Sequence, residues 1–146
     1  MRARSGAFPL EVPLRLVLMF SVYGDTVLDP FWGTGTTSMA ALVAGRNSVG
    51  VEREPDLVAA FEERVGEAPR LSREVATDRL DAHREFVAQR RAEGEEPGYD
   101  AEHYDFPVVT KQERELRLRV VDSVERVDDG GAAEPTRRWL AEHSNL

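Results

Sequence analysis

The residues most able to do chemistry gather in one short run, D-P-F-W-G-T-G-T-T at positions 29–37. Gly33 and Gly35 permit positive φ angles and let a ligand approach the backbone closely. Amides at the start of a following helix would point toward that ligand, and the hydroxyls of Thr36 and Thr37 can add hydrogen bonds. The run therefore predicts a loop that binds a small nucleotide-like ligand at the carboxyl end of a strand.

A second acidic residue follows the loop at a sequence separation that suits such a site. Glu52 follows Asp29 by 23 residues, at the end of the next apolar run. In α/β folds an acidic residue at about this separation (about 20 residues) reaches ribose hydroxyls. The pair predicts a ligand that contains a ribose.

Two phosphate-binding interpretations fail on specific residues. A P-loop ends in Gly-Lys-Ser/Thr, whereas Thr36 follows Gly35 and the only lysine is Lys111. A dinucleotide fingerprint has a third glycine where this chain has Ser38. The carboxylate of Asp29 at the loop entrance suits an ammonium group and would repel a pyrophosphate.

The elements around the loop predict a parallel α/β unit. Residues 26–29 form a short apolar run typical of a buried strand, a helix follows from Thr36 until Gly45 stops it, residues 48–52 form a second strand, and Pro55 opens another helix. The order strand–helix–strand–helix gives a right-handed βαβ unit. A further helix is expected over residues 9–21.

The pattern is weaker after Gly66. A charged helix is expected over 71–91, strands over 106–109 and 116–121, a turn at 128–131, and a last helix over 135–143. We therefore divide the chain into an α/β unit, residues 1–68, and an acidic appendage of unknown role, residues 69–146.

The motifs resemble those of a known family. D-P-F-x-G-x-G-T-T, followed by G-V-E at positions 50–52, resembles the cofactor-binding motifs of the amino-group DNA methyltransferases, which methylate adenine N6 or cytosine N4. F-P-L-E-V-P at positions 8–13 resembles the segment that precedes this loop in the circularly permuted members. The resemblance covers about residues 7–65 and implies a partial Rossmann-like fold of the S-adenosylmethionine-dependent methyltransferases.

The resemblance also implies S-adenosyl-L-methionine as cofactor. Asp29, Gly33 and Gly35 would surround its methionine portion, and Glu52 would bind its ribose hydroxyls. The full set of cofactor-binding residues implied is Phe8, Pro9, Asp29, Pro30, Phe31, Gly33, Thr34, Gly35, Thr36, Thr37 and Glu52. Trp32 is expected on the loop surface.

The family's catalytic motif, Asp/Asn/Ser-Pro-Pro-aromatic, is absent, because the chain contains no Pro-Pro pair. In that motif two oxygens accept hydrogen bonds from the target amine and the aromatic ring stacks on the flipped base. We therefore expect the cofactor-binding portion of a DNA methyltransferase, inactive alone, which contacts DNA through the complete enzyme with a separately encoded catalytic half. A truncated or split gene would account for it.

Two other functions stay open at this point. The chain could be a non-catalytic cofactor-binding remnant or an interaction subunit of a split methyltransferase. An RNA or protein methyltransferase could use the same cofactor loop, although the D-P-F and G-T-T motifs favour DNA.

The amino-acid composition excludes several kinds of site and indicates the protein's environment. The absence of cysteine excludes disulfides, zinc–cysteine sites and the cysteine adduct of cytosine-C5 methylation. The apolar stretch 14–20 is too short to span a bilayer, so a soluble cytoplasmic protein is expected. The net charge of −8 combines −9 from residues 54–146 with +1 from residues 1–53. A single lysine among 19 basic residues is typical of proteins from a high-salt cytoplasm. We expect a halophilic source.

This composition predicts that salt stabilises the fold. Raising KCl from about 0.15 M to about 1 M shortens the screening length from about 8 Å to about 3 Å, which weakens repulsion among the carboxylates. The melting temperature, followed by circular dichroism, should therefore rise across that range. A melting temperature that stays constant or falls would contradict this origin of the acidic surface.

Overall fold

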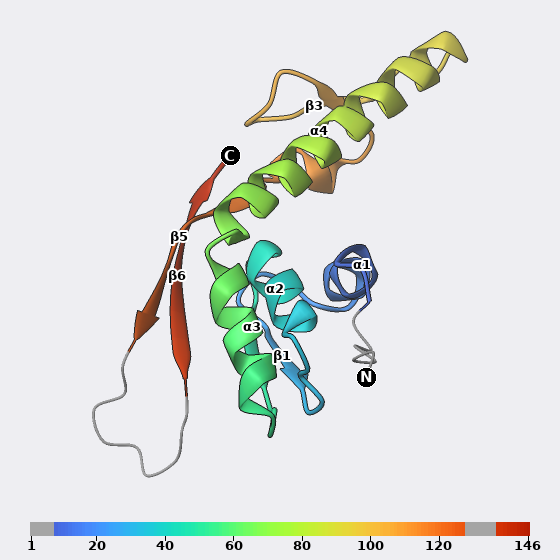
Figure 1. Cartoon of the computed structure of the whole chain (residues 1–146). Helices are drawn as coiled ribbons and strands as arrows, with labels where there is room; N and C mark the ends of the chain where they lie inside the picture. The colour runs from blue at the N-terminus through green and yellow to red at the C-terminus, as the bar shows by residue number, and fades with distance from the viewer. Residues whose placement is uncertain (1–7, 128–136) are drawn as a thin grey trace.

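The computed structural model describes residues 8–127 and 137–146, and its centre is a parallel βαβ unit (Figure 1). Strand β1 (Thr26–Asp29) leads through the glycine loop into α2 (Thr36–Val43), and β2 (Asn47–Gly50) returns parallel to β1 before α3 (Pro55–Val65). The pairing runs from Thr26 opposite Asn47 to Asp29 opposite Gly50. The expected unit is confirmed, with β2 ending two residues earlier than predicted.

Helix α2 is the buried centre of this unit. Its Met39, Ala40, Ala41 and Val43 have almost no exposed surface. The short alanine side chains let other elements approach closely, which is how a small helix becomes fully enclosed. Helix α1 (Glu11–Phe20) packs on α2 through one stripe that includes Leu14 and Val17.

A buried arginine joins the ends of these two helices. The guanidinium of Arg46 donates to the hydroxyl and carbonyl oxygens of Ser21 and to the carbonyl oxygen of Ala44. It also stacks 4.9 Å from the ring centre of Tyr23. Burial lowers the pKa of Arg46 from its ordinary value. The side chain thus satisfies carbonyl groups at both helix ends that have no partner within the helices.

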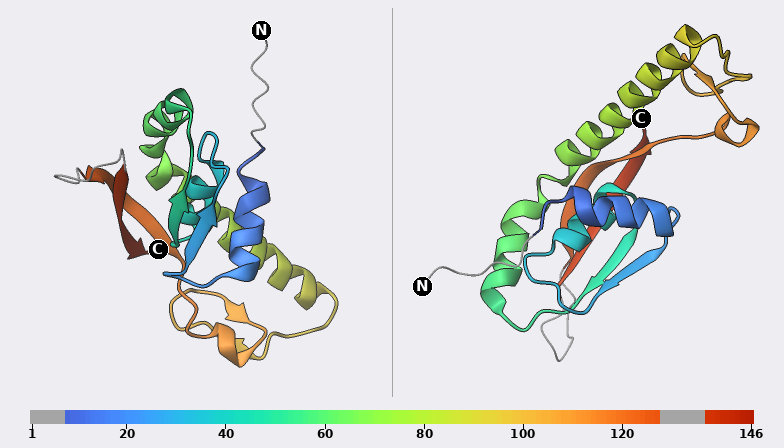
Figure 2. Two further views of the ribbon diagram at one scale, coloured as in Figure 1. Left: turned by 90° about the horizontal axis from the view of Figure 1, so that it is seen from below. Right: turned by 90° about the vertical axis from the view of Figure 1, so that its right-hand side faces the viewer.

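Helix α4 (Ala68–Ala92) begins in the core and extends beyond it (Figure 2). Ala68, Ser72 and Ala76 are buried at four-residue spacing, which places them on one face of the helix. Beyond α4, β3 (Tyr99–Asp100) and β4 (Pro107–Val108) form a small antiparallel pair, and a short 3₁₀ helix, η1 (Lys111–Glu113), follows. Thr110 and Glu113 cap that helix reciprocally.

The end of the chain corrects the prediction of a final helix over 135–143. Strand β6 (Arg138–Asn145) lies there and pairs antiparallel with β5 (Arg119–Val127). Along β6, Trp139, Ala141 and His143 are half-buried while the residues between them are exposed. This two-residue alternation is the pattern of a strand with one covered face. The turn predicted at 128–131 lies outside the described residues.

The β5–β6 hairpin shares its core with the βαβ unit. Val121 is fully buried in the same cluster as Met39, and its amide donates to the hydroxyl of Ser72 at 3.1 Å. That hydroxyl donates in turn to the carbonyl oxygen of Val43 at 3.3 Å. Elements on both sides of residue 68 thus contribute to one core.

This packing predicts that Trp139 stabilises the whole fold. Its ring lies 5.0 Å from that of Phe61 and 6.3 Å from that of Trp32. Trp139→Ala should lower the free energy of unfolding by about 3 kcal/mol, since it removes a large packed ring. Leu140→Ala, on the exposed face of the same strand, should change it by less than about 0.5 kcal/mol. Chemical denaturation measures both, and equal effects would contradict the packing.

Candidate functional site

The candidate site is the loop that joins β1 to α2. Asp29 ends β1, and its Oδ1 accepts the backbone N–H of Phe31 at 3.0 Å. The amide of Trp32 donates to the carbonyl oxygen of Val51 at 3.1 Å, and that of Gly35 donates to the carbonyl oxygen of Trp32 at 2.9 Å. These bonds hold the loop as a tight turn across the ends of both strands.

The two glycines of the loop face different surroundings. Both have positive φ, 57° at Gly33 and 74° at Gly35. A Cβ atom on Gly35 would lie 2.4 Å from the ring of Phe61, whereas a Cβ atom on Gly33 would meet nothing closer than 4.0 Å. Gly35 is therefore required by the core, and Gly33 borders open space that a ligand can occupy.

Trp32 does not lie on the loop surface, so that expectation is wrong. Only 8% of its surface is exposed, and its Nε1 donates to the hydroxyl of Ser38 at 2.6 Å. Its ring packs 4.7 Å from that of Phe61 and directly over Gly50, where a Cβ atom would lie 2.1 Å from the indole. In the sequence, Trp32 stands in a glycine-containing loop. No local pattern there predicts its contacts with Gly50 and Phe61.

Glu52 closes the loop against the end of β2. Its Oε2 accepts the amide of Gly33 at 2.8 Å, and its Oε1 accepts the amides of Arg53 at 2.8 Å and Glu54 at 3.0 Å. These backbone donors, Glu54 and Gly33 foremost, lower the pKa of Glu52. The group is therefore ionised at neutral pH, and its two oxygens keep room for one further hydrogen bond.

The other residues predicted for the site differ in how far they are exposed to solvent. Phe31 is 90% exposed, Pro30 is exposed, and Thr34 is half-buried on the loop. Thr36 is buried and Thr37 half-buried in the first turn of α2. The loop and Glu52 thus come together as expected.

Phe8 and Pro9 are exposed and precede α1. In the described part of the chain, no hydrogen bond or ring contact joins Phe8 to the loop. Their connection to the site is indirect, because α1 packs on α2, the helix into which the loop leads.

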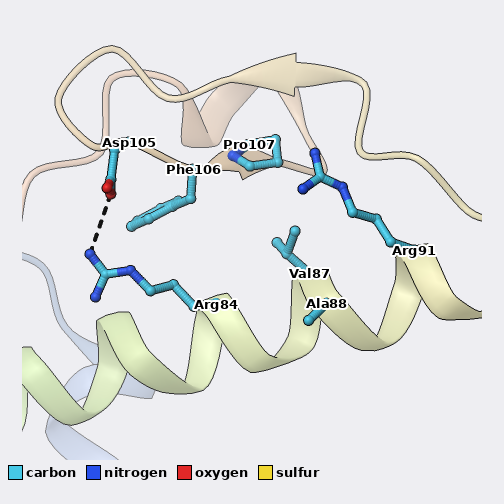
Figure 3. Close-up of a pocket in the computed structure, with 7 residues that line it drawn as sticks. All are labelled: Arg84, Val87, Ala88, Arg91, Asp105, Phe106 and Pro107. Atoms are coloured by element: carbon cyan, nitrogen blue, oxygen red, sulfur yellow. Dashed lines mark hydrogen bonds and ion pairs between the residues drawn. The ribbon is translucent and has the colours of Figure 1, made fainter.

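A separate cavity of about 520 Å³ lies between α4 and residues 105–107 (Figure 3). Arg84 and Arg91 project from α4 at the two ends of the cavity, and Phe106 and Pro107 lie across from the helix. Asp81 and Asp105 pair with Arg84 and raise its pKa, and Glu96 pairs with Arg91 at 3.1 Å. No sequence signal pointed here, because Asp105 and Glu96 belong to an irregular segment. The arginines are neutralised by neighbouring carboxylates and form a surface ion-pair network.

The described residues contain no helix long and apolar enough to cross a membrane.

Several known proteins match this chain. Residues 4–63 match the family model N6_N4_Mtase, DNA methylase. The type II methyltransferase M.MthZI of Methanothermobacter thermautotrophicus is 42% identical over 118 residues, 81% of this chain and 32% of that protein. M.MjaI of Methanocaldococcus jannaschii is 54% identical over 63 residues, 43% of this chain and 21% of that protein.

A solved structure also matches. A protein of Thermus thermophilus, described as a DNA modification methylase, is 55% identical, with a TM-score of 0.39 over 40% of this chain and 25% of that one. One of its crystal structures is a complex with S-adenosyl-L-methionine.

The chain thus spans a third or less of the length of these curated relatives. The match to M.MthZI, at 118 residues, is longer than the part up to residue 68 and so extends into residues 69–146. The glycine loop, Glu52 and the first three helices all lie in or at the boundary of the matched residues 4–63. Over those residues, this chain is similar to the amino-group (N6/N4) DNA methyltransferases.

Proposed function

We propose that this chain supplies the S-adenosyl-L-methionine-binding part of an enzyme that methylates an exocyclic amine of DNA, N6 of adenine or N4 of cytosine. The observation that carries this proposal is the closure of the glycine loop by Glu52, whose Oε2 accepts the amide of Gly33 at 2.8 Å. This contact puts an ionised carboxylate beside the one glycine of the loop that borders open space.

The residues present suit this cofactor. Asp29 uses Oδ1 within the loop and, among the described contacts, keeps Oδ2 for the ammonium of the methionine portion. Glu52 can accept a further hydrogen bond from a ribose hydroxyl. The ring of Phe31, which is 90% exposed, offers an apolar surface on the same loop. When bound, the cofactor supplies a sulfonium-linked methyl group that an amine attacks directly.

The chain's own residues bind and orient this cofactor but do not prepare the target amine. The loop contains Asp29-Pro30-Phe31-Trp32, yet Trp32 is buried in the core and cannot stack on a flipped base. The proposal therefore assigns the amine-binding motif, and the contacts with DNA, to another part of the complete enzyme. The acidic composition with a single lysine supports a halophilic source.

The first prediction concerns cofactor binding. Isothermal calorimetry should detect weak binding of S-adenosyl-L-methionine, which Asp29→Ala abolishes. Glu52→Gln should weaken it less, because it loses a charged acceptor worth about 1.5–3 kcal/mol but keeps a neutral one. Gly33→Ala should weaken binding by backbone strain and by filling the open side of the loop.

A matched control exists at Gly66, where φ is −62° and an added Cβ would meet nothing within 4 Å. Gly66→Ala should bind like the wild type. Gly35→Val is unsuitable as a binding test, because its clash with Phe61 disturbs the core. Equal affinities for wild type, Asp29→Ala and Gly33→Ala would exclude this loop as the cofactor site.

The second prediction is that the purified chain transfers no methyl group. Incubated with tritiated S-adenosyl-L-methionine and DNA, it should leave the DNA unlabelled, because no Pro-Pro-aromatic site exists in its sequence. Labelled N6-methyladenine or N4-methylcytosine in a nuclease digest would show that the amine site has been assigned to the wrong polypeptide.

A further inference from the structure

Two hydroxyl groups and an indole form a hydrogen-bonded chain on the inner side of the glycine loop. The Nε1 of Trp32 donates to the Oγ of Ser38 at 2.6 Å, and that oxygen is also hydrogen-bonded to the Oγ of Ser48. Ser38 is buried in α2, and Ser48 is half-buried in β2. The three side chains therefore join the loop to the helix that follows it and to the second strand.

The donors and acceptors available explain why both serines are needed. An indole N–H can only donate, so it takes one lone pair of the Ser38 oxygen and leaves the Ser38 hydroxyl hydrogen for Ser48. A serine inside a helix can otherwise turn its hydroxyl toward a carbonyl of the preceding turn. Ser48 gives Ser38 a partner on β2, and this partner favours the rotamer that holds Trp32.

The position of Ser38 has a different role in dinucleotide-binding folds. The third glycine of their fingerprint stands there, and it lets the helix pack closely on the strand. In this chain the space between α2 and β2 at that position holds the bonded pair of hydroxyl groups. The pair thus links helix and strand and, at the same time, satisfies a buried indole N–H that would otherwise have no partner.

The backbone of Trp32 carries this constraint to the open side of the loop. Its amide donates to the carbonyl oxygen of Val51 at 3.1 Å, next to Glu52 in the sequence. The residue after Trp32 is Gly33, whose amide donates to the Oε2 of Glu52. An indole turned away from Ser38 would pull on these backbone groups and would shift Gly33 relative to Glu52.

We propose that Ser38 and Ser48 are positioning residues for the cofactor, which hold the indole of Trp32 in the orientation that keeps the Gly33 side of the loop open to S-adenosyl-L-methionine. The proposal rests on the proposed function and deepens it. Neither serine contacts the cofactor, since both lie on the inner side of the loop. Their effect on cofactor affinity passes through Trp32.

Isothermal calorimetry of the full chain with S-adenosyl-L-methionine tests this proposal. Ser38→Ala and Ser48→Ala should each raise the dissociation constant about fivefold, the effect of about one lost hydrogen bond. Ser48→Ala is the milder change, because it leaves the indole N–H its acceptor on Ser38. It therefore keeps the test decisive if Ser38→Ala fails to fold.

Ser72→Ala is the matched control. Ser72 is a serine with 1% of its surface exposed, and its hydroxyl joins the amide of Val121 to the carbonyl oxygen of Val43 without contacting the loop. Its loss should lower the melting temperature without changing the dissociation constant. A general loss of stability would therefore not reproduce the result expected of the two positioning residues.

NMR of the ¹⁵N-labelled chain without cofactor gives a second, spectroscopic measurement. In Ser38→Ala and Ser48→Ala the indole N–H signal of Trp32 and the amide signal of Gly33 should both move. In Ser72→Ala both signals should keep their wild-type positions. Unmoved signals in the first two variants would overturn the coupling between the serines and the loop.

The calorimetric outcomes separate this inference from the proposed function. Wild-type affinity in both Ser38→Ala and Ser48→Ala would overturn the inference alone, and so would an equal loss of affinity in Ser72→Ala. A wild-type chain that does not bind S-adenosyl-L-methionine would overturn the proposed function and this inference with it.

Discussion

The packing of Trp32 is the constraint on which the rest of the structure depends. Its indole lies over Gly50 of β2 and within ring contact of Phe61 of α3 and Trp139 of β6. One side chain thus fixes the glycine loop, the sheet, a helix and the hairpin relative to one another. A Cβ atom at Gly50 would lie 2.1 Å from the indole, so the position requires glycine while Trp32 packs there.

This arrangement divides the loop into an inner and an outer side. On the inner side Gly35 and Trp32 belong to the core, and on the outer side Gly33 borders open space and Phe31 is exposed. The rigidity of the inner side holds the outer groups in place without a ligand. Preorganisation of this kind reduces the entropy lost on binding.

The sequence predicted the βαβ unit because its signals are local. Strand 26–29, the helix from Thr36 and the stop at Gly45 each depend on neighbouring residues, and Asp29 and Glu52 follow from the strand ends. The hairpin was missed because the alternation over 138–145 pairs with residues about twenty positions earlier and was taken for a helix. The burial of Trp32 and the Arg84–Asp105 cavity depend on distant contacts that no local pattern encodes.

The central claim is that the open side of the glycine loop binds S-adenosyl-L-methionine. Titration of the ¹⁵N-labelled chain with this cofactor, followed by NMR, tests it most directly. The amides of Gly33, Arg53 and Glu54, which Glu52 now accepts, should shift, while that of Gly66 should not. Shifts confined to the Arg84–Phe106 cavity, or no shifts at millimolar cofactor, would contradict the claim.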